Sequence, residues 1–127
     1  MIEGEPLAQK RARFARVGAH VRTYDPMSEK KEVTKAIIRA QVRQRLKGSV
    51  CCVMEFFMPI PKSYTKKRRE ACIAMEELPA KKPDIDNFVK YYFDCMNDIA
   101  FDDDSQVCAL EAYKYFSETP RVEIKLI

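Results

Sequence analysis

The sequence predicts one α+β domain over residues 1–127, with a mixed β-sheet and two principal helices. Two stretches have apolar residues at helical spacing, and three others are rich in β-prone residues and end at Gly, Pro or Ser. No repeat, low-complexity segment or interdomain linker interrupts them. At this length we expect a single core, at a size where dimers are common.

The composition is that of a soluble globular protein, with 46% hydrophobic and 33% charged residues. No apolar run approaches the roughly 20 residues of a membrane helix, and the polar N-terminus does not resemble a signal peptide. The five cysteines form no CxxC pair and there is one histidine, so a disulfide framework and a zinc site are both disfavoured. We therefore expect a cytoplasmic protein with reduced thiols.

The first 24 residues predict a short strand, a basic loop and a second extended piece with Gly18 at its turn. Phe14 is expected to be a core anchor. Four cations within seven residues favour contact with phosphate over a merely solvated loop. These are Lys10, Arg11, Arg13 and Arg16.

A helix of about 18 residues is predicted to follow Ser28 and to end at Gly48. Its apolar positions predict a narrow buried stripe made of Val33, Ala36, Ile37 and Ala40. The cations of this segment, Lys31 among them, are assigned to a solvated outer face.

Residues 50–58 predict a central strand buried on both faces, which Pro59 and Pro61 end. A short helix is expected after Ser63 or Thr65. The basic residues of the stretch 62–70 are equally compatible with phosphate binding and with a solvated surface. They are Lys62, Lys66, Lys67, Arg68 and Arg69.

Residues 81–107, KKPDIDNFVKYYFDCMNDIAFDDDSQV, contain two acidic clusters on either side of an amphipathic helix. Asp84 and Asp86 stand at its start, where Asp86 or Asn87 is the expected cap, and the triplet 102–104 follows its end. If the following loop folds back, the clusters can meet. Grouped carboxylates repel one another unless a divalent cation lies among them, so we predict a magnesium site.

Two strands are expected to close the domain, at 106–116 and 121–127, because apolar residues alternate in both. Charge is divided along the chain: residues 1–70 hold 17 Lys and Arg against 7 Asp and Glu, and the rest hold 6 against 12. A basic half suits a polyanion and an acidic half suits a cation that acts on it. The division is typical of a metal-dependent nuclease.

The pattern K-x-P-D-I-D-N-x-x-K, followed after a helix by D-D-S-Q-V, resembles RusA-type Holliday junction resolvases of phages and prophages. Gly4-Glu5-Pro6 with the K-x-R-x-R-F-like segment after it, and the strand that ends in Phe57-Met58-Pro59, are similar as well. The resemblance implies a RusA-like homodimer and a crossover junction endodeoxyribonuclease that nicks four-way DNA symmetrically in recombination and repair. Tyr91, Tyr113, Tyr115 and Phe116 are spare apolar residues that can line the dimer interface.

The resemblance assigns the metal to Asp84, Asp86 and Asp104, with Asp103 as the alternative to Asp104. It gives Lys90 a catalytic role, whereas a simple i,i+4 ion pair with Asp86 or Asp94 is the structural alternative. Mg²⁺ is the expected cofactor, and Mn²⁺ is expected to replace it. The ion would activate a water for in-line attack without a covalent protein intermediate.

Three other functions remain open. The first alternative is a nuclease that acts on other branched DNA, and the second is a junction-binding protein with weak or no cleavage. The third is an interaction module that a metal ion stabilises. A structural calcium loop is disfavoured because no EF-hand spacing is present.

Overall fold

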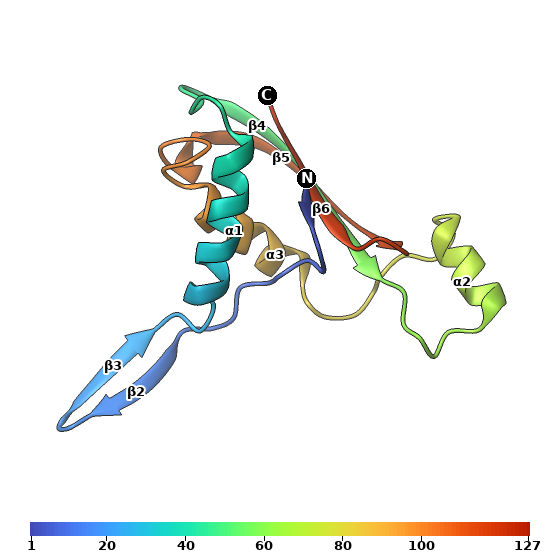
Figure 1. Cartoon of the computed structure of the whole chain (residues 1–127), viewed down its shortest axis with the longest axis horizontal. Coiled ribbons are helices and arrows are strands. Elements are labelled where there is room, and N and C mark those ends of the chain that lie inside the picture. Colours follow the sequence, from blue (N-terminus) through green and yellow to red (C-terminus); the bar gives the residue numbers. More distant parts are fainter.

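The computed structural model describes all 127 residues, and its centre is a four-stranded mixed sheet in the order β1-β6-β4-β5 (Figure 1). The strands are β1 (Ile2–Glu3), β4 (Val50–Pro59), β5 (Val107–Ser117) and β6 (Arg121–Leu126). β4 pairs parallel with β5 and antiparallel with β6, and β1 pairs antiparallel with β6. β5 is an edge strand. The α+β class, the mixed sheet and the late strands are confirmed.

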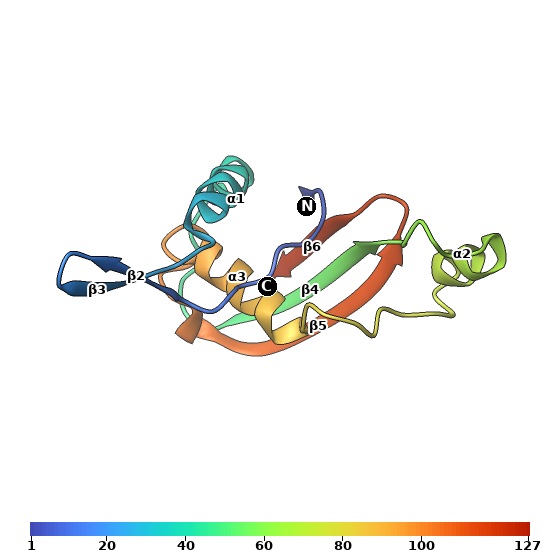
Figure 2. The ribbon, with the colours of Figure 1, turned by 90° about the horizontal axis from the view of Figure 1, so that it is seen from below.

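β4 is the central strand that its sequence predicts, but only one of its faces is fully buried. Cys52, Met54 and Phe56 point into the main core, whereas Cys51 is exposed and Glu55 is half-buried. The expectation of burial on both faces is wrong because the helices α1 (Ser28–Gln41) and α3 (Ile85–Met96) both pack on one side of the sheet (Figure 2).

Helix α3 (Ile85–Met96) supplies most of the core opposite the sheet. Its Phe88 stacks on Phe56 of β4 with ring centroids 4.9 Å apart. Tyr91 and Tyr92 are also buried, so the assignment of Tyr91 to spare surface is wrong. The buried Tyr91 hydroxyl forms a hydrogen bond with Thr34 of α1 (2.9 Å), which satisfies both groups.

Helix α1 (Ser28–Gln41) is shorter than predicted and presents a different face to the core. Lys31, Thr34 and Ile38 are buried, while Val33 is 65% exposed. The predicted stripe through Val33 is therefore wrong. Apolar residues are sparse in this helix, and two carboxylates from other elements neutralise Lys31, so a charged residue occupies the inner face.

Strands β2 (Arg13–Val17) and β3 (His20–Tyr24) form an antiparallel hairpin that projects from the body (Figures 1 and 2). Gly18 has φ +60 at its turn, as expected of glycine there. Phe14 is 73% exposed, so its expected role as a core anchor is wrong. The hairpin has no apolar face packed on the core.

Helix α2 (Lys66–Ile73) projects from the other end of the long axis, and Thr65 accepts a capping hydrogen bond from the Arg68 N–H (3.2 Å). A short 3₁₀ turn, η1 (Asp104–Gln106), leads into β5. No helix is long and apolar enough to span a membrane. The body thus carries a basic hairpin at one end and a basic helix at the other.

Candidate active site

The first acidic pair lies at the N-terminus of α3 and is free of ion pairs. Asp84 is the N-cap residue, but its side chain makes no capping hydrogen bond. Asp86 Oδ1 accepts a hydrogen bond from the N–H of Asn87 (3.0 Å). Both carboxylates are exposed, and the positive end of the helix dipole stabilises their charge. They are therefore available to a ligand.

Lys90 lies one turn further along α3, on the same edge as Asp86. It is exposed and forms no ion pair, so the structure does not contain the expected pairing with Asp86 or Asp94. Its ammonium group is left free to meet an anion.

The second acidic cluster is mostly engaged in local structure. Asp102 accepts from Arg45 (2.9 Å) and Lys47 (3.1 Å), and these cations lower its pKa. Its carboxylate is therefore held in ion pairs and is not available to a ligand. Asp103 caps η1, and hydrogen bonds from Ser105 lower its pKa.

Asp104 is the member of the triplet whose carboxylate is least committed. It is half-buried, and its Oδ2 accepts one long hydrogen bond from Asn97 Nδ2 (3.4 Å) at the C-cap of α3. Because Asp103 is used as a cap, the geometry favours Asp104 over Asp103 as a ligand.

Gln106 holds this acidic loop, a role that sequence reasoning missed. Its Oε1 accepts from the N–H groups of Asp102 and Asp103, and its Nε2 donates to the carbonyls of Leu46 and Gly48. The loop is thereby attached to the segment that precedes β4.

The two acidic clusters lie at opposite ends of α3. Asp84 and Asn97 are the two caps of this helix, and a rise of 1.5 Å per residue separates them by about 20 Å. Asp104 lies beside Asn97, so the loop does not fold back to the helix start as the sequence allowed. No three potential metal ligands lie together within the chain.

A hollow of about 500 Å³ adjoins the first acidic pair. Asp84 and Asn87 line it from α3, and Lys10, Lys30 and Lys82 line it from other elements. The backbone N–H of Gln9 donates to the Asn87 carbonyl (2.9 Å), which fixes the start of the hairpin beside the helix. Cations therefore surround the entrance to Asp84.

Lys114 of β5 positions the segment just before Asp84, and its sequence context gave no sign of this. Its Nζ donates to the carbonyls of Lys81 (2.8 Å) and Pro83 (3.0 Å). The Lys-Lys-Pro segment is thus fastened to the edge strand.

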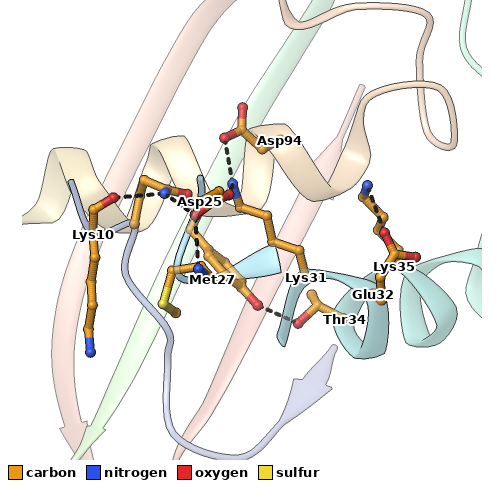
Figure 3. Close-up of polar contacts among 10 residues, drawn as sticks. Lys10, Asp25, Met27, Lys31, Glu32, Thr34, Lys35 and Asp94 are labelled. Carbon is orange, nitrogen blue, oxygen red and sulfur yellow. Dashed lines mark hydrogen bonds and ion pairs between the residues drawn. The ribbon is translucent and has the colours of Figure 1, made fainter. Parts of the chain in front are cut away.

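A partly buried network of ion pairs joins the base of the hairpin, α1 and α3 (Figure 3). Lys31 Nζ donates to Asp25, which follows β3 (2.6 Å), and to Asp94 of α3 (3.1 Å). Partial desolvation acts to raise the pKa of Asp25, but hydrogen bonds from Lys31, the Met27 N–H and Gln9 outweigh it and bring the pKa to about 2. Desolvation acts to lower the pKa of Lys31, yet its two partners raise it. Lys31 therefore stays charged and fixes the hairpin base against the helix that bears Asp84.

The basic residues predicted to bind DNA fall into two separate groups. One lies on and just before the hairpin and the other on and just before α2, at opposite ends of the body. Arg68 is committed, because it pairs with Glu77 (2.8 Å) and stacks over Tyr64. The other members form no ion pair: Lys10, Arg11, Arg13, Arg16, Lys62, Lys66, Lys67 and Arg69.

Comparisons with known proteins identify the family of the chain. The sequence profile of the endodeoxyribonuclease RusA family matches residues 3–127. The chain is also similar to the uncharacterized protein YqaN of Bacillus subtilis (strain 168), with 36% identity over 131 residues that cover 98% of this chain and 92% of the relative. The chain therefore belongs to the RusA endodeoxyribonuclease family.

Proposed function

We propose that this protein is a Mg²⁺-dependent endonuclease that resolves four-way DNA junctions by paired nicks, in the cytoplasm of a bacterium or of a phage-infected cell. Family membership supports nuclease chemistry on DNA. The free carboxylates at the start of α3, between two basic projections, support a site that works on a phosphate backbone.

The observation that carries the proposal is the separation of the acidic clusters along α3. A two-fold axis across the middle of this helix would place Asp84 and Asp86 of one copy beside Asp104 of a second copy. The same axis would create two equivalent sites, which is the symmetry that paired nicks in a four-way junction require. We propose that the active unit is a homodimer with composite sites.

A partly exposed apolar strip on α3 supports pairing along this helix. Ile85, Val89 and Phe93 are spaced four residues apart and share one edge of the helix. Ile85 is 36% exposed, and Leu110 of the neighbouring edge strand is 43% exposed. A second copy that covers this strip would remove apolar surface from water.

The donor set fits magnesium once both copies contribute, because it consists of carboxylate oxygens that no protein cation occupies. Asp84, Asp86 and Asp104 would hold the ion, which would supply positive charge to activate water and to stabilise the leaving oxygen. Mn²⁺ would occupy the same oxygen ligands. Lys90 Nζ would neutralise the charge that develops on the phosphoryl oxygens. The hairpin and α2 cations would hold the flanking phosphates.

The test is cleavage of a labelled synthetic four-way junction with Mg²⁺, with Mn²⁺ and with EDTA, for the wild-type protein and for Asp86→Asn. We expect symmetric nicks that require the divalent ion and that disappear in the variant while junction binding persists. Equal cleavage of linear duplex would contradict junction specificity and would favour a nuclease for other DNA.

A branched-DNA-binding protein with weak or no cleavage is the second candidate. It is favoured by the absence of three clustered carboxylates within one chain. Tight junction binding without nicks under Mg²⁺ or Mn²⁺, from a protein that is dimeric in solution, would establish it.

A further inference from the structure

A second cleft lies between α2 and the far end of the sheet, outside the acidic site. Its volume is about 280 Å³, and it combines aromatic and basic side chains. The residues that matter here are Tyr64, Arg68, Lys82, Lys114 and Phe116, with Glu77 at the back of Arg68. Ligand pockets of roughly 300 Å³ suit one small molecule, so the cleft is too small for a duplex and large enough for a single ring system.

The aromatic walls of the cleft are fixed in place. Tyr64 and Phe116 meet edge to face, with ring centroids 6.1 Å apart and planes inclined by 71°. The Arg68 guanidinium lies 3.7 Å from the centre of the Tyr64 ring, and Glu77 holds it there through Nε (2.9 Å) and Nη2 (2.8 Å). Because these contacts exist without a ligand, little side-chain ordering remains to oppose binding.

The charge of the cleft favours an anion. Glu77 is neutralised by Arg68, and hydrogen bonds from Arg68 and Cys72 lower its pKa. Lys82 is exposed and forms no ion pair, so its ammonium group is available to a phosphate. Aromatic stacking surfaces interleaved with cations are typical of sites for single-stranded nucleic acid.

The cleft opens toward the candidate active site. Glu5 and Lys82 line both this cleft and the hollow beside Asp84. Lys82 and Asp84 are two residues apart, at most about 7 Å of extended chain. Lys114 fastens the segment between them through the Lys81 and Pro83 carbonyls. A nucleotide in the cleft would thus adjoin a phosphate placed at Asp84.

We propose that this cleft binds one unpaired nucleobase of the DNA strand that crosses Asp84. Phe116 and the face of Tyr64 that Arg68 does not cover are the stacking surfaces, and Lys82 contacts the adjacent phosphate. The proposal rests on the proposed function for the identity of the strand. It adds that the nuclease selects a position at which a base has left the helix, as bases at a branch point can do at low cost.

A first experiment measures affinity for a ten-nucleotide oligo(dT) by fluorescence anisotropy, in EDTA, for wild type, Tyr64→Leu, Phe116→Leu and Tyr113→Leu. Tyr113 is the matched control, because it is an exposed aromatic of the same strand as Phe116 but pairs with Glu55 on the uncovered face of the sheet. Since stacking on one aromatic residue contributes about 1–3 kcal/mol, we expect each cleft variant to lose about 5-fold to about 150-fold in affinity and the control to lose less than twofold. Equal affinities among variants that keep the wild-type melting temperature would overturn the proposal.

A second experiment does not depend on how well the variants fold. A four-way junction with 5-iododeoxyuridine beside the nicked position is irradiated in complex with the wild-type protein in EDTA, and the cross-linked peptide is identified by mass spectrometry. A cross-link to Tyr64 or Phe116 supports the cleft, and a cross-link only to another aromatic, such as Phe14, overturns it. If the protein cleaves junctions but cross-links elsewhere, the cleft proposal fails alone. If it neither binds nor cleaves junctions, the proposed function fails.

Discussion

The two ends of α3 carry similar numbers of aspartates, yet these aspartates have different neighbours. At the N-terminal end, Asp84 and Asp86 are exposed and unpaired, beside the free ammonium of Lys90. At the C-terminal end, Asp102 is held by two cations and Asp103 caps a turn. The hydrogen-bond and ion-pair partners of each carboxylate, and not the number of carboxylates nearby, therefore decide which aspartates remain available for chemistry.

The largest effect is expected within the second cluster itself. Asp104→Asn should reduce junction cleavage by at least about 100-fold, because it removes a carboxylate oxygen from the proposed metal ligands. Asp102→Asn is the control: it should retain cleavage within a few fold and change the melting temperature only slightly, since its ion pairs are exposed. Single-turnover cleavage and thermal unfolding measure the two effects. A comparable loss of cleavage in both variants would contradict the assignment of Asp104, and not Asp102, as a metal ligand.

At the N-terminal end of α3, Lys90→Gln tests whether the free ammonium group of Lys90 contributes to cleavage. The variant keeps a polar side chain, one bond shorter, but loses the charge, so we expect cleavage to fall about 10-fold to 100-fold while junction affinity changes less than threefold. Lys35→Gln, on an exposed pair with Glu32 of α1, should leave cleavage unchanged. A loss of affinity that matches the loss of rate would instead make Lys90 a DNA-binding residue.

Removal of the Lys31 ion pairs, which join the hairpin base to α3, is expected to have a moderate effect on stability. Lys31→Met fills the same space but leaves Asp25 and Asp94 without their cation, and it should reduce the free energy of unfolding by about 1–3 kcal/mol. Urea denaturation measures it. A more stable variant would show that apolar packing outweighs the ion pairs at this position.

A smaller effect is expected from acid. The pKa of Asp25 is lowered to about 2 from an ordinary value of 3.8, so its stabilisation is complete above pH 3.8 and is lost as the pH falls toward 2. The carboxylate remains partly exposed, which limits this contribution to about 1 kcal/mol. Between pH 5 and pH 2 the melting temperature of wild type should fall further than that of Asp25→Asn. Parallel curves would assign acid sensitivity to other carboxylates.

Local patterns in the sequence were enough to predict β4, a turn at Gly18, the helix between the two acidic clusters and the final strands, whereas β2 was expected to be a basic loop. The inner face of α1 could not be predicted, because burial of Lys31 depends on Asp94, which is 63 residues away. Which aspartate of the triplet 102–104 keeps a free carboxylate likewise depends on contacts with distant residues. Arg45 and Lys47 bind Asp102, and four hydrogen bonds of Gln106 hold the loop.

The spacing of the acidic clusters was visible in the sequence, but their relation in space was not. A helix of known length fixes the distance between its caps, whereas the direction of the loop that follows depends on contacts with Leu46 and Gly48. That loop keeps Asp104 at the C-terminal end of α3. The proposal that a second copy completes each site rests on this separation, whereas the resemblance implied only that the protein is a homodimer.

Composite active sites, in which Asp84 and Asp86 come from one copy and Asp104 from the other, can be tested with a heterodimer of two differently substituted chains. Asp86→Asn and Asp104→Asn chains carrying different tags are co-expressed, and the heterodimer is purified through both tags. In a composite arrangement one site of this heterodimer collects both substitutions and the other keeps all three aspartates. If the sites are composite, we expect each homodimer to be inactive and the heterodimer to nick one strand of the junction. An inactive heterodimer, beside an active wild-type dimer with the same two tags, would place each site within a single chain and contradict the account.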